Sequence, residues 1–206
     1  MKNKVVREIL DWVVCIIIAY VLYLIINYFL GTVSGVKQSS MYPTSKNGDK
    51  LIISRRVINP KELKRGQIVT LEAPVFEVGM ELKDNIAFYP EYDGITKFAY
   101  NVMGIGKKSY VKRIVALEGE HLFISEDGKV YIDDKLLEED YLNADVKTIR
   151  SGDFYDLTVP EGCVFVMGDN RAESADSRLF GAIPKDKIEG NVICRIWPLN
   201  KIGKLD

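Results

Sequence analysis

The chain has 206 residues, with 28 Lys and Arg against 29 Asp and Glu and one histidine. This near balance of charge includes no basic stripe, so the sequence gives no sign of a nucleic-acid partner. Clusters of histidine and cysteine at metal-ligand spacing are missing too, so neither a metal nor another cofactor is implied. About 170 residues follow an apolar N-terminal segment, enough for one substantial core or two small lobes.

The first feature along the chain is an uncharged run over residues 12–30, preceded by three basic residues within 1–11. A helix of this length spans roughly 28 Å, close to the hydrocarbon thickness of a bilayer. The run therefore predicts a transmembrane anchor at 12–30. A cleaved signal peptide is the alternative, because basic residues precede the run and Ser34 and Gly35 follow it. The length of the run and the missing Ala-x-Ala site favour a retained anchor.

The orientation of this anchor does not follow from a count of charges. Three Lys or Arg precede the span and three lie within the next 20 residues, so the positive-inside count is a tie. The basic residues before the span are more closely spaced, and a long C-terminal domain tends to translocate regardless of its charge. We therefore predict a single-pass protein of the cell membrane, with residues 1–11 cytoplasmic and residues 31–206 extracytoplasmic.

A serine follows the apolar run after ten residues, in the segment Ser-Met-Tyr-Pro-Thr at 40–44. A serine nucleophile needs a base, and the one histidine, His121, lies in an expected turn with no flanking residues that suggest a triad. A desolvated lysine is the other base that can activate a serine hydroxyl. Lys112 fits, since it lies among apolar residues in the strand-like run 110–117. The alternative is that Lys112 is one of several exposed charges on an edge strand.

Beyond residue 30 the sequence reads mostly as short β-rich runs broken by turn residues. Asp127 and Gly128 form a good hairpin turn between two of them. We expect a mainly β, antiparallel and partly barrel-like domain behind the anchor. The expected strands are 51–54, 67–71, 109–117, 121–125, 129–132, 163–167 and 191–197.

The loop 168–181 is crowded with acids, arginines and small polar residues after an apolar strand. It reads Gly-Asp-Asn-Arg-x-x-Ser-x-Asp-Ser-Arg-x-x-Gly. Together with Ser-Met-x-Pro-Thr and Tyr-Val-Lys-Arg, in this order behind an N-terminal anchor, it resembles the type I signal peptidases. The resemblance spans residues 40–181 and implies a membrane-bound serine endopeptidase that removes signal peptides from secretory preproteins.

The resemblance also implies roles for particular residues. Ser40 is the nucleophile and Lys112 the general base, and Ser174 matches a hydroxyl that orients the lysine amine. Supporting charged residues are Asp176, Arg178 and Arg113. Candidates for shallow pockets that accept alanine at the first and third residues before the cut are Val36, Leu51, Ile53, Tyr110 and Val111; ordinary core packing is the alternative for Leu51 and Ile53.

Gln38 stands two residues before the nucleophile, where family members commonly carry glycine or serine. Its side-chain amide is a candidate donor to the oxyanion, and a surface residue without a role is the alternative. The backbone amide of Ser40 is the natural first donor.

A lysine that serves as a base near pH 8 needs a pKa two to three units below the usual value of about 10.4. Apolar burial must lower it. A carboxylate beside the amine would act in the opposite direction, so we expect Asp176 to be engaged by Arg178 or Arg113.

The segment 75–108 resembles an insertion relative to compact family members, acidic at first, rich in aromatics and basic at its end. A flap over the cleft, a membrane-contacting loop and a decorative insertion all remain open. Its glycines at 104 and 106 do not have phosphate-loop spacing, so no nucleotide is expected. Cys163 and Cys194 lie in apolar runs, which favours buried free thiols over a disulfide.

Two other functions fit part of this pattern. One is a Ser/Lys protease of related fold that cleaves itself or a dedicated partner. The other is a catalytically idle, membrane-anchored binding module, against which the full set of candidate catalytic residues argues.

Overall fold

The computed structural model describes most of the 206 residues. Outside the described residues lie 1, 31, 38, 55–62, 78–81, 102–105, 144 and 206, together with the side chains of 2–3, 24–30, 98–99 and 101. Gln38, predicted as an oxyanion donor, is therefore outside the described part of the chain.

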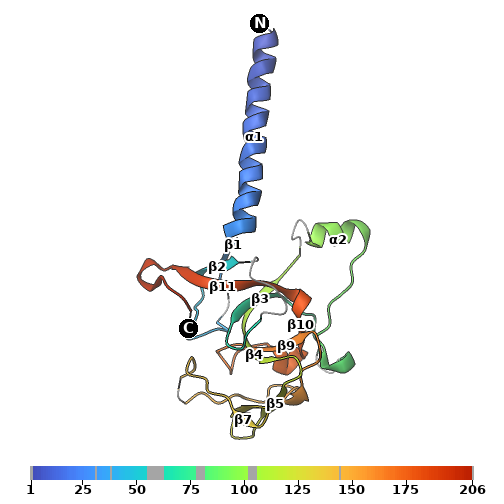
Figure 1. Cartoon of the computed structure of the whole chain (residues 1–206), viewed down its shortest axis with the longest axis vertical. Coiled ribbons are helices and arrows are strands. Elements are labelled where there is room, and N and C mark those ends of the chain that lie inside the picture. Colours follow the sequence, from blue (N-terminus) through green and yellow to red (C-terminus); the bar gives the residue numbers. More distant parts are fainter. Residues whose placement is uncertain are drawn as a thin grey trace.

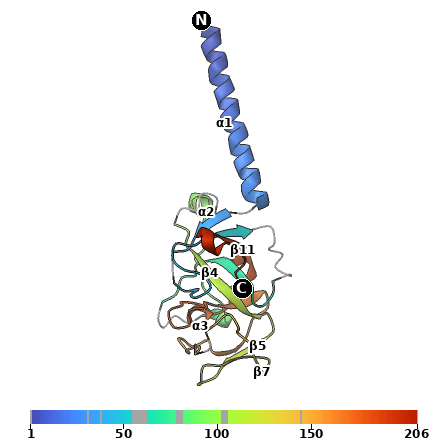
Figure 2. The same cartoon turned by 90° about the vertical axis from the view of Figure 1, so that its left-hand side faces the viewer.

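Helix α1 (Lys2–Leu30) projects away from the rest of the molecule (Figure 1, Figure 2). Its side chains from Trp12 to Tyr23 are all exposed, although most of them are apolar. Measured over the described residues, no helix combines the length and the apolar character that crossing a membrane requires. Of the segment predicted as an anchor, 12–30, side chains are described only as far as Tyr23.

A seven-stranded antiparallel sheet forms the body of the protein, in the order β1-β2-β11-β3-β4-β9-β10. The central strands β3, β4 and β9 are rich in Val and Ile, which suits a sheet buried on both faces. The two strands at the far edges have only four and two residues. The strands are β1 (Thr32–Gly35), β2 (Lys50–Ser54), β3 (Ile68–Glu72), β4 (Ser109–Leu117), β9 (Cys163–Met167), β10 (Ile183–Pro184) and β11 (Ile188–Trp197).

A smaller four-stranded sheet lies at the end of the body away from α1 (Figure 1, Figure 2). Its order is β7-β6-β5-β8, and β5 and β6 form the predicted hairpin around Asp127 and Gly128. Buried side chains of this sheet pack with others from β4 and β9 into one core cluster. The strands are β5 (His121–Ile124), β6 (Val130–Ile132), β7 (Lys135–Leu136) and β8 (Asp156–Thr158).

Helices are short after α1. They are α2 (Gly94–Asn101), α3 (Ser177–Phe180) and the 3-10 turns η1 (Lys83–Asn85), η2 (Lys185–Lys187) and η3 (Leu199–Lys201). The prediction of a mainly β, antiparallel, partly barrel-like domain behind an N-terminal helix is confirmed. All three cysteines have free thiols, with Cys163 buried and Cys194 partly exposed, so the alternative of a disulfide does not hold.

The segment 75–108 contains η1 and α2 and packs beside β3. The phenol of Tyr89 donates to the carbonyl oxygen of Glu72 at 3.1 Å, and that of Tyr100 donates to the Glu72 carboxylate at 3.0 Å. Helix α2 lies at the end of the body from which α1 projects (Figure 1, Figure 2).

Candidate active site

Ser40 lies at the start of a turn between β1 and β2. The N–H of Tyr42 donates to the carbonyl of Ser39 at 3.0 Å, and the N–H of Ser45 donates to the carbonyl of Met41 at 2.8 Å. Among the described residues, the N–H of Ser40 itself donates no hydrogen bond. An unengaged backbone donor beside the nucleophile is what a developing oxyanion requires.

Lys112 lies in the middle of β4, an interior strand that pairs with β3 on one side and β9 on the other. Its side chain is 1% exposed, and its Nζ lies 2.8 Å from Oγ of Ser40. The alternative of an exposed charge on an edge strand is therefore wrong. The strand brings the predicted base into hydrogen-bonding contact with the predicted nucleophile.

Burial lowers the pKa of Lys112 to about 8. Loss of hydration disfavours the charged amine and is the largest cause, as the apolar neighbourhood predicts. Among the charges nearby, Asp176 raises the pKa, Arg178 lowers it and Asp169 raises it. A neutral amine that can accept a proton is therefore accessible near pH 8.

Asp176 is fully buried and forms a two-pronged ion pair with Arg178, with both oxygen–nitrogen distances 2.8 Å. One carboxylate oxygen also accepts from the N–H of Arg178 at the start of α3, and the other accepts from the N–H of Gly168 at 3.0 Å. These bonds hold Asp176 by the charged loop, with Arg178 as the predicted partner.

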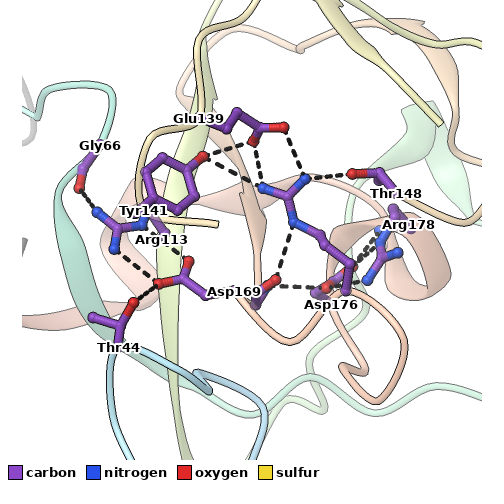
Figure 3. A network of polar contacts seen from close by, with 11 residues as sticks. Thr44, Gly66, Arg113, Glu139, Tyr141, Thr148, Asp169, Asp176 and Arg178 are labelled. Atoms are coloured by element: carbon purple, nitrogen blue, oxygen red, sulfur yellow. Dashed lines mark hydrogen bonds and ion pairs between the residues drawn. The ribbon is translucent and has the colours of Figure 1, made fainter. Parts of the chain in front are cut away.

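Arg113 pairs with Asp169, at 2.9 and 2.8 Å, and donates to the carbonyl of Gly66 at 3.0 Å. Thr44, four residues after the nucleophile, donates its hydroxyl hydrogen to the same carboxylate (Figure 3). Asp169 thus links the turn after Ser40 to the strand that carries Lys112. The role of Asp169 had not been predicted from the sequence.

A second buried arginine, Arg171, connects the same loop to the segment before β8. Its guanidinium binds the carboxylate of Glu139 and the hydroxyl of Thr148, and its Nε donates to the carbonyl of Gly168 at 3.2 Å (Figure 3). The ring of Tyr141 stacks 3.8 Å from the guanidinium carbon of Arg113, beside this pair. Sequence analysis missed Arg171 as a site residue because its partners lie in loops without a motif.

Asn170 binds the backbone at the nucleophile. Its N–H donates to the carbonyl of Ser40 at 3.0 Å, and its side-chain amide donates to the carbonyl of Ser39 at 3.2 Å. The loop after β9 therefore holds Ser40 in place through main-chain contacts.

Ser174 is buried, and its hydroxyl has no hydrogen-bond partner among the described residues. The expected bond to the amine of Lys112 is therefore not made in this structure. Ser174 instead lies against Gly168, where an added Cβ would be only 2.2 Å from its Oγ.

His121 does not meet Ser40. It lies partly exposed on β5 in the smaller sheet, where its Nε2 lies 2.8 Å from the carboxylate of Asp156. The structure thus separates the one histidine of the chain from the candidate nucleophile.

A cavity of about 570 Å³ lies on one side of Ser40, between β1 and the start of β4. Four of the five residues predicted to contact substrate line it: Val36, Ile53, Tyr110 and Val111. Leu51 does not line it, and its side chain is buried, as the alternative of core packing expects. Of the insertion 75–108, only Lys107 and Lys108 among its described residues line this cavity, which gives no support to a flap.

Residues 9–197 match the family described as signal peptidase, peptidase S26. The chain belongs to this family. It is 34% identical over 207 residues to signal peptidase I of Bacillus licheniformis, covering 97% of this chain and 95% of the relative. It is 32% identical to signal peptidase I T of Bacillus subtilis (strain 168), covering 97% and 91%. The prediction that the chain is an enzyme, a serine endopeptidase, is confirmed.

A crystal structure of a signal peptidase I from Enterococcus faecalis V583 is also similar. It has 24% sequence identity and a TM-score of 0.40, over 63% of this chain and 96% of that one.

Proposed function

We propose that this signal peptidase removes signal peptides from secretory preproteins, cutting after an Ala-x-Ala-like site with Ser40 as nucleophile and Lys112 as general base. The observation that carries the proposal is the contact between these two side chains. The Nζ of Lys112 lies 2.8 Å from Oγ of Ser40, and burial lowers the pKa of the amine to about 8.

In the first step, neutral Lys112 accepts the hydroxyl proton of Ser40 as Oγ attacks the peptide carbonyl. The N–H of Ser40 is free to donate to the oxyanion, and Gln38 remains a candidate for a second donor. The ammonium of Lys112 then protonates the departing amine, the peptide bond breaks, and an acyl-enzyme is left on Ser40.

In the second step, Lys112 is neutral again and takes a proton from water, which attacks the ester carbonyl. The tetrahedral intermediate collapses and Ser40 leaves with the proton held by Lys112. Every proton in this cycle passes through one amine, so a pKa near the working pH is an advantage.

The supporting residues act on geometry and charge rather than on the proton itself. Asp176 is neutralised by Arg178, and Arg113 by Asp169, so that the burial of Lys112 is not offset by a nearby free carboxylate. Ser174 remains the candidate to orient the amine, although its hydroxyl has no hydrogen-bond partner among the described residues.

The part of the substrate before the cut binds in the 570 Å³ cavity. An extended peptide can add as a strand between β1 and the start of β4, with alternate side chains toward Val36, Ile53 and Val111. We expect shallow contacts with these three apolar side chains to favour alanine at the first and third residues before the cut.

Attachment to a membrane is part of the proposal. The described apolar side chains of α1 are all exposed, and residues 12–30 carry no charge. At the same end of the body, Ile95 of α2 is 87% exposed (Figure 1). We expect the protein to remain in the membrane pellet after carbonate extraction and a variant lacking residues 1–30 to be released. Protease added outside intact cells should degrade the domain 31–206; protection of that domain contradicts the proposed orientation.

The cleavage test uses the detergent-solubilised full chain with a secretory preprotein, and mass spectrometry to map the cut. We expect one cut after an Ala-x-Ala-like site with the parent protein, and none with Ser40→Ala or Lys112→Ala. Turnover by either variant well above a mock preparation contradicts the assignment of these two residues. Cleavage of the chain itself, with the preprotein intact, supports a self-cleaving protease instead.

A further inference from the structure

A second cavity, of about 450 Å³, lies beside the same nucleophile. Lys37, Ser40 and Tyr110 line both cavities, whereas Lys112 lines only this one. The residues assigned to the alanine pockets, Val36, Ile53 and Val111, line only the other. The two cavities therefore meet at the reacting atoms and extend in different directions from them.

This inference rests on the proposed function, in which Lys112 transfers a proton to the leaving amine. That transfer determines which part of a substrate enters the second cavity. Lys112 must protonate the departing amine, so the leaving nitrogen has to lie within hydrogen-bonding distance of its Nζ. The chain after the cut then continues past Lys112 into the cavity that this lysine lines. The new N-terminus of the product is released from there.

Among the described residues that line this second cavity, one carries a carboxylate, Glu173. One of its oxygens, Oε2, accepts from the hydroxyl of Ser39 at 3.2 Å and from the side-chain amide of Asn170 at 3.1 Å. The bond from Ser39 places the carboxylate beside the residue that precedes the nucleophile, and the two bonds leave Oε1 without a hydrogen bond among the described residues. Glu173 is exposed, and these two hydrogen bonds hold its carboxylate at the mouth of the site with one oxygen open to a ligand.

Lys37 lines the same cavity with the opposite charge. Its side chain is exposed and forms no hydrogen bond or ion pair with the described residues. An unheld lysine side chain must lose rotamer freedom to bind a substrate carboxylate, whereas Glu173 is already held. The fixed charge therefore dominates selection.

We propose that Glu173 is a specificity residue for the substrate chain after the cut, selecting a basic side chain over an acidic one within the first two residues of the mature protein. Attraction to a Lys or Arg and repulsion of an Asp or Glu both act through a partly solvated cavity. Ion pairs in such surroundings are modest and weaken with salt. We therefore expect discrimination of about 5-fold at low ionic strength.

The test uses the full chain in detergent and three peptides that are identical through the cut and differ only at the second residue after it, which is Lys, Gln or Glu. The parent should cleave the Lys peptide with a kcat/KM about 5-fold above that of the Glu peptide, and added salt should reduce the ratio. Glu173→Gln keeps the length and the acceptor oxygen but removes the charge, so the ratio should fall to about 1. Glu173→Lys should invert it.

The matched control is Glu161→Gln, which removes one negative charge from the exposed turn before β9 and should leave the ratio unchanged. A ratio that persists in Glu173→Gln, or that is abolished by Lys37→Gln instead, overturns the assignment to Glu173. Equal cleavage of all three peptides by the parent overturns this inference and leaves the proposed function intact. If none of the peptides is cut and preproteins are not cut either, both fail.

Discussion

Both carboxylate oxygens of Asp176 lie 2.8 Å from guanidinium nitrogens of Arg178, and both side chains are 0% exposed. This pair keeps a buried acid close to Lys112 without leaving its charge uncompensated. The acid still raises the pKa of Lys112 and Arg178 lowers it, but burial dominates both effects. The amine of Lys112 is therefore a weaker base than that of a free lysine, because burial removes its hydration.

Removal of Asp176 should destabilise the protein strongly. In Asp176→Ala the guanidinium of Arg178 stays buried, and among the described residues only the carbonyl of Ile149 is left as its acceptor. Breaking a buried pair on one side costs about 3–5 kcal/mol. Urea unfolding of the full chain in detergent measures the loss. The control is Asp153→Ala, an exposed acid, which should change the free energy of unfolding by less than about 0.5 kcal/mol.

Replacement of Lys112 by methionine should abolish cleavage and yet stabilise the fold. The pKa of Lys112 is lowered from 10.5 to about 8, so the unfolded chain binds more protons than the folded one between these values. This cost, about 3 kcal/mol, is complete below pH 8 and fades as pH rises toward 10.5. Methionine removes it.

Thermal unfolding of the parent and of Lys112→Met at pH 7 and pH 10 tests whether the variant is the more stable protein and whether its advantage falls with pH. The variant should have the higher Tm at pH 7, by several degrees, and a much smaller advantage at pH 10. An equal or lower Tm at pH 7 would mean that lost contacts of the lysine stem outweigh the burial of its charge.

The dependence of cleavage on pH should follow the same amine. Since only neutral Lys112 accepts the proton of Ser40, kcat/KM should rise through the alkaline range with an apparent pKa of about 8. Lys112→Arg should be inactive, because a guanidinium stays protonated. His121→Ala should keep both the rate and the profile, because His121 is in the other sheet. A profile controlled by a group near 6.5 and lost in His121→Ala would assign the base to the histidine.

The sequence predicts those strands that carry a recognisable apolar pattern of their own. The ranges of β4 and β9 agree to the residue with the expected strands, because each contains an apolar run, 114–117 in β4 and 163–167 in β9, and is bounded by turn residues. Strands β1, β7, β8 and β10 were not predicted. They have two to four residues, and what defines each is its pairing with a longer strand rather than its own pattern.

The same distinction applies to the candidate site. Lys112 can be recognised from the sequence because most of its neighbours there are apolar. The ion pair between Arg113 and Asp169 depends instead on strand register. Arg113 lies opposite Met167 in the pairing of β4 with β9, which places it near the residue two positions further on. The ion pair between Arg171 and Glu139 depends in turn on the path of the irregular segment between β7 and β8. No local pattern contains that information.

Gly168 provides a test of how closely the charged loop approaches the nucleophile. An added Cβ would lie 2.2 Å from Oγ of Ser174 and 2.4 Å from the carbonyl oxygen of Ser40. The φ angle of Gly168 lies outside the left-handed region, so the substitution is opposed by lack of space alone. Since the contact with Ser40 is to backbone, Gly168→Ala must move the nucleophile or the loop.

Gly168→Ala should lower kcat by about 10²-fold or more, because a shift of about 1 Å in a reacting group has an effect of this size. Its free energy of unfolding should fall by about 1–3 kcal/mol from overpacking, so activity is compared where both proteins are folded. Adding Ser174→Gly removes the clash with Ser174 but leaves the clash with Ser40. The double variant should therefore still have a kcat about 10²-fold below that of Ser174→Gly alone. Recovery in the double variant would show that the loss passes through Ser174, and that the Ser40 carbonyl has room to adjust.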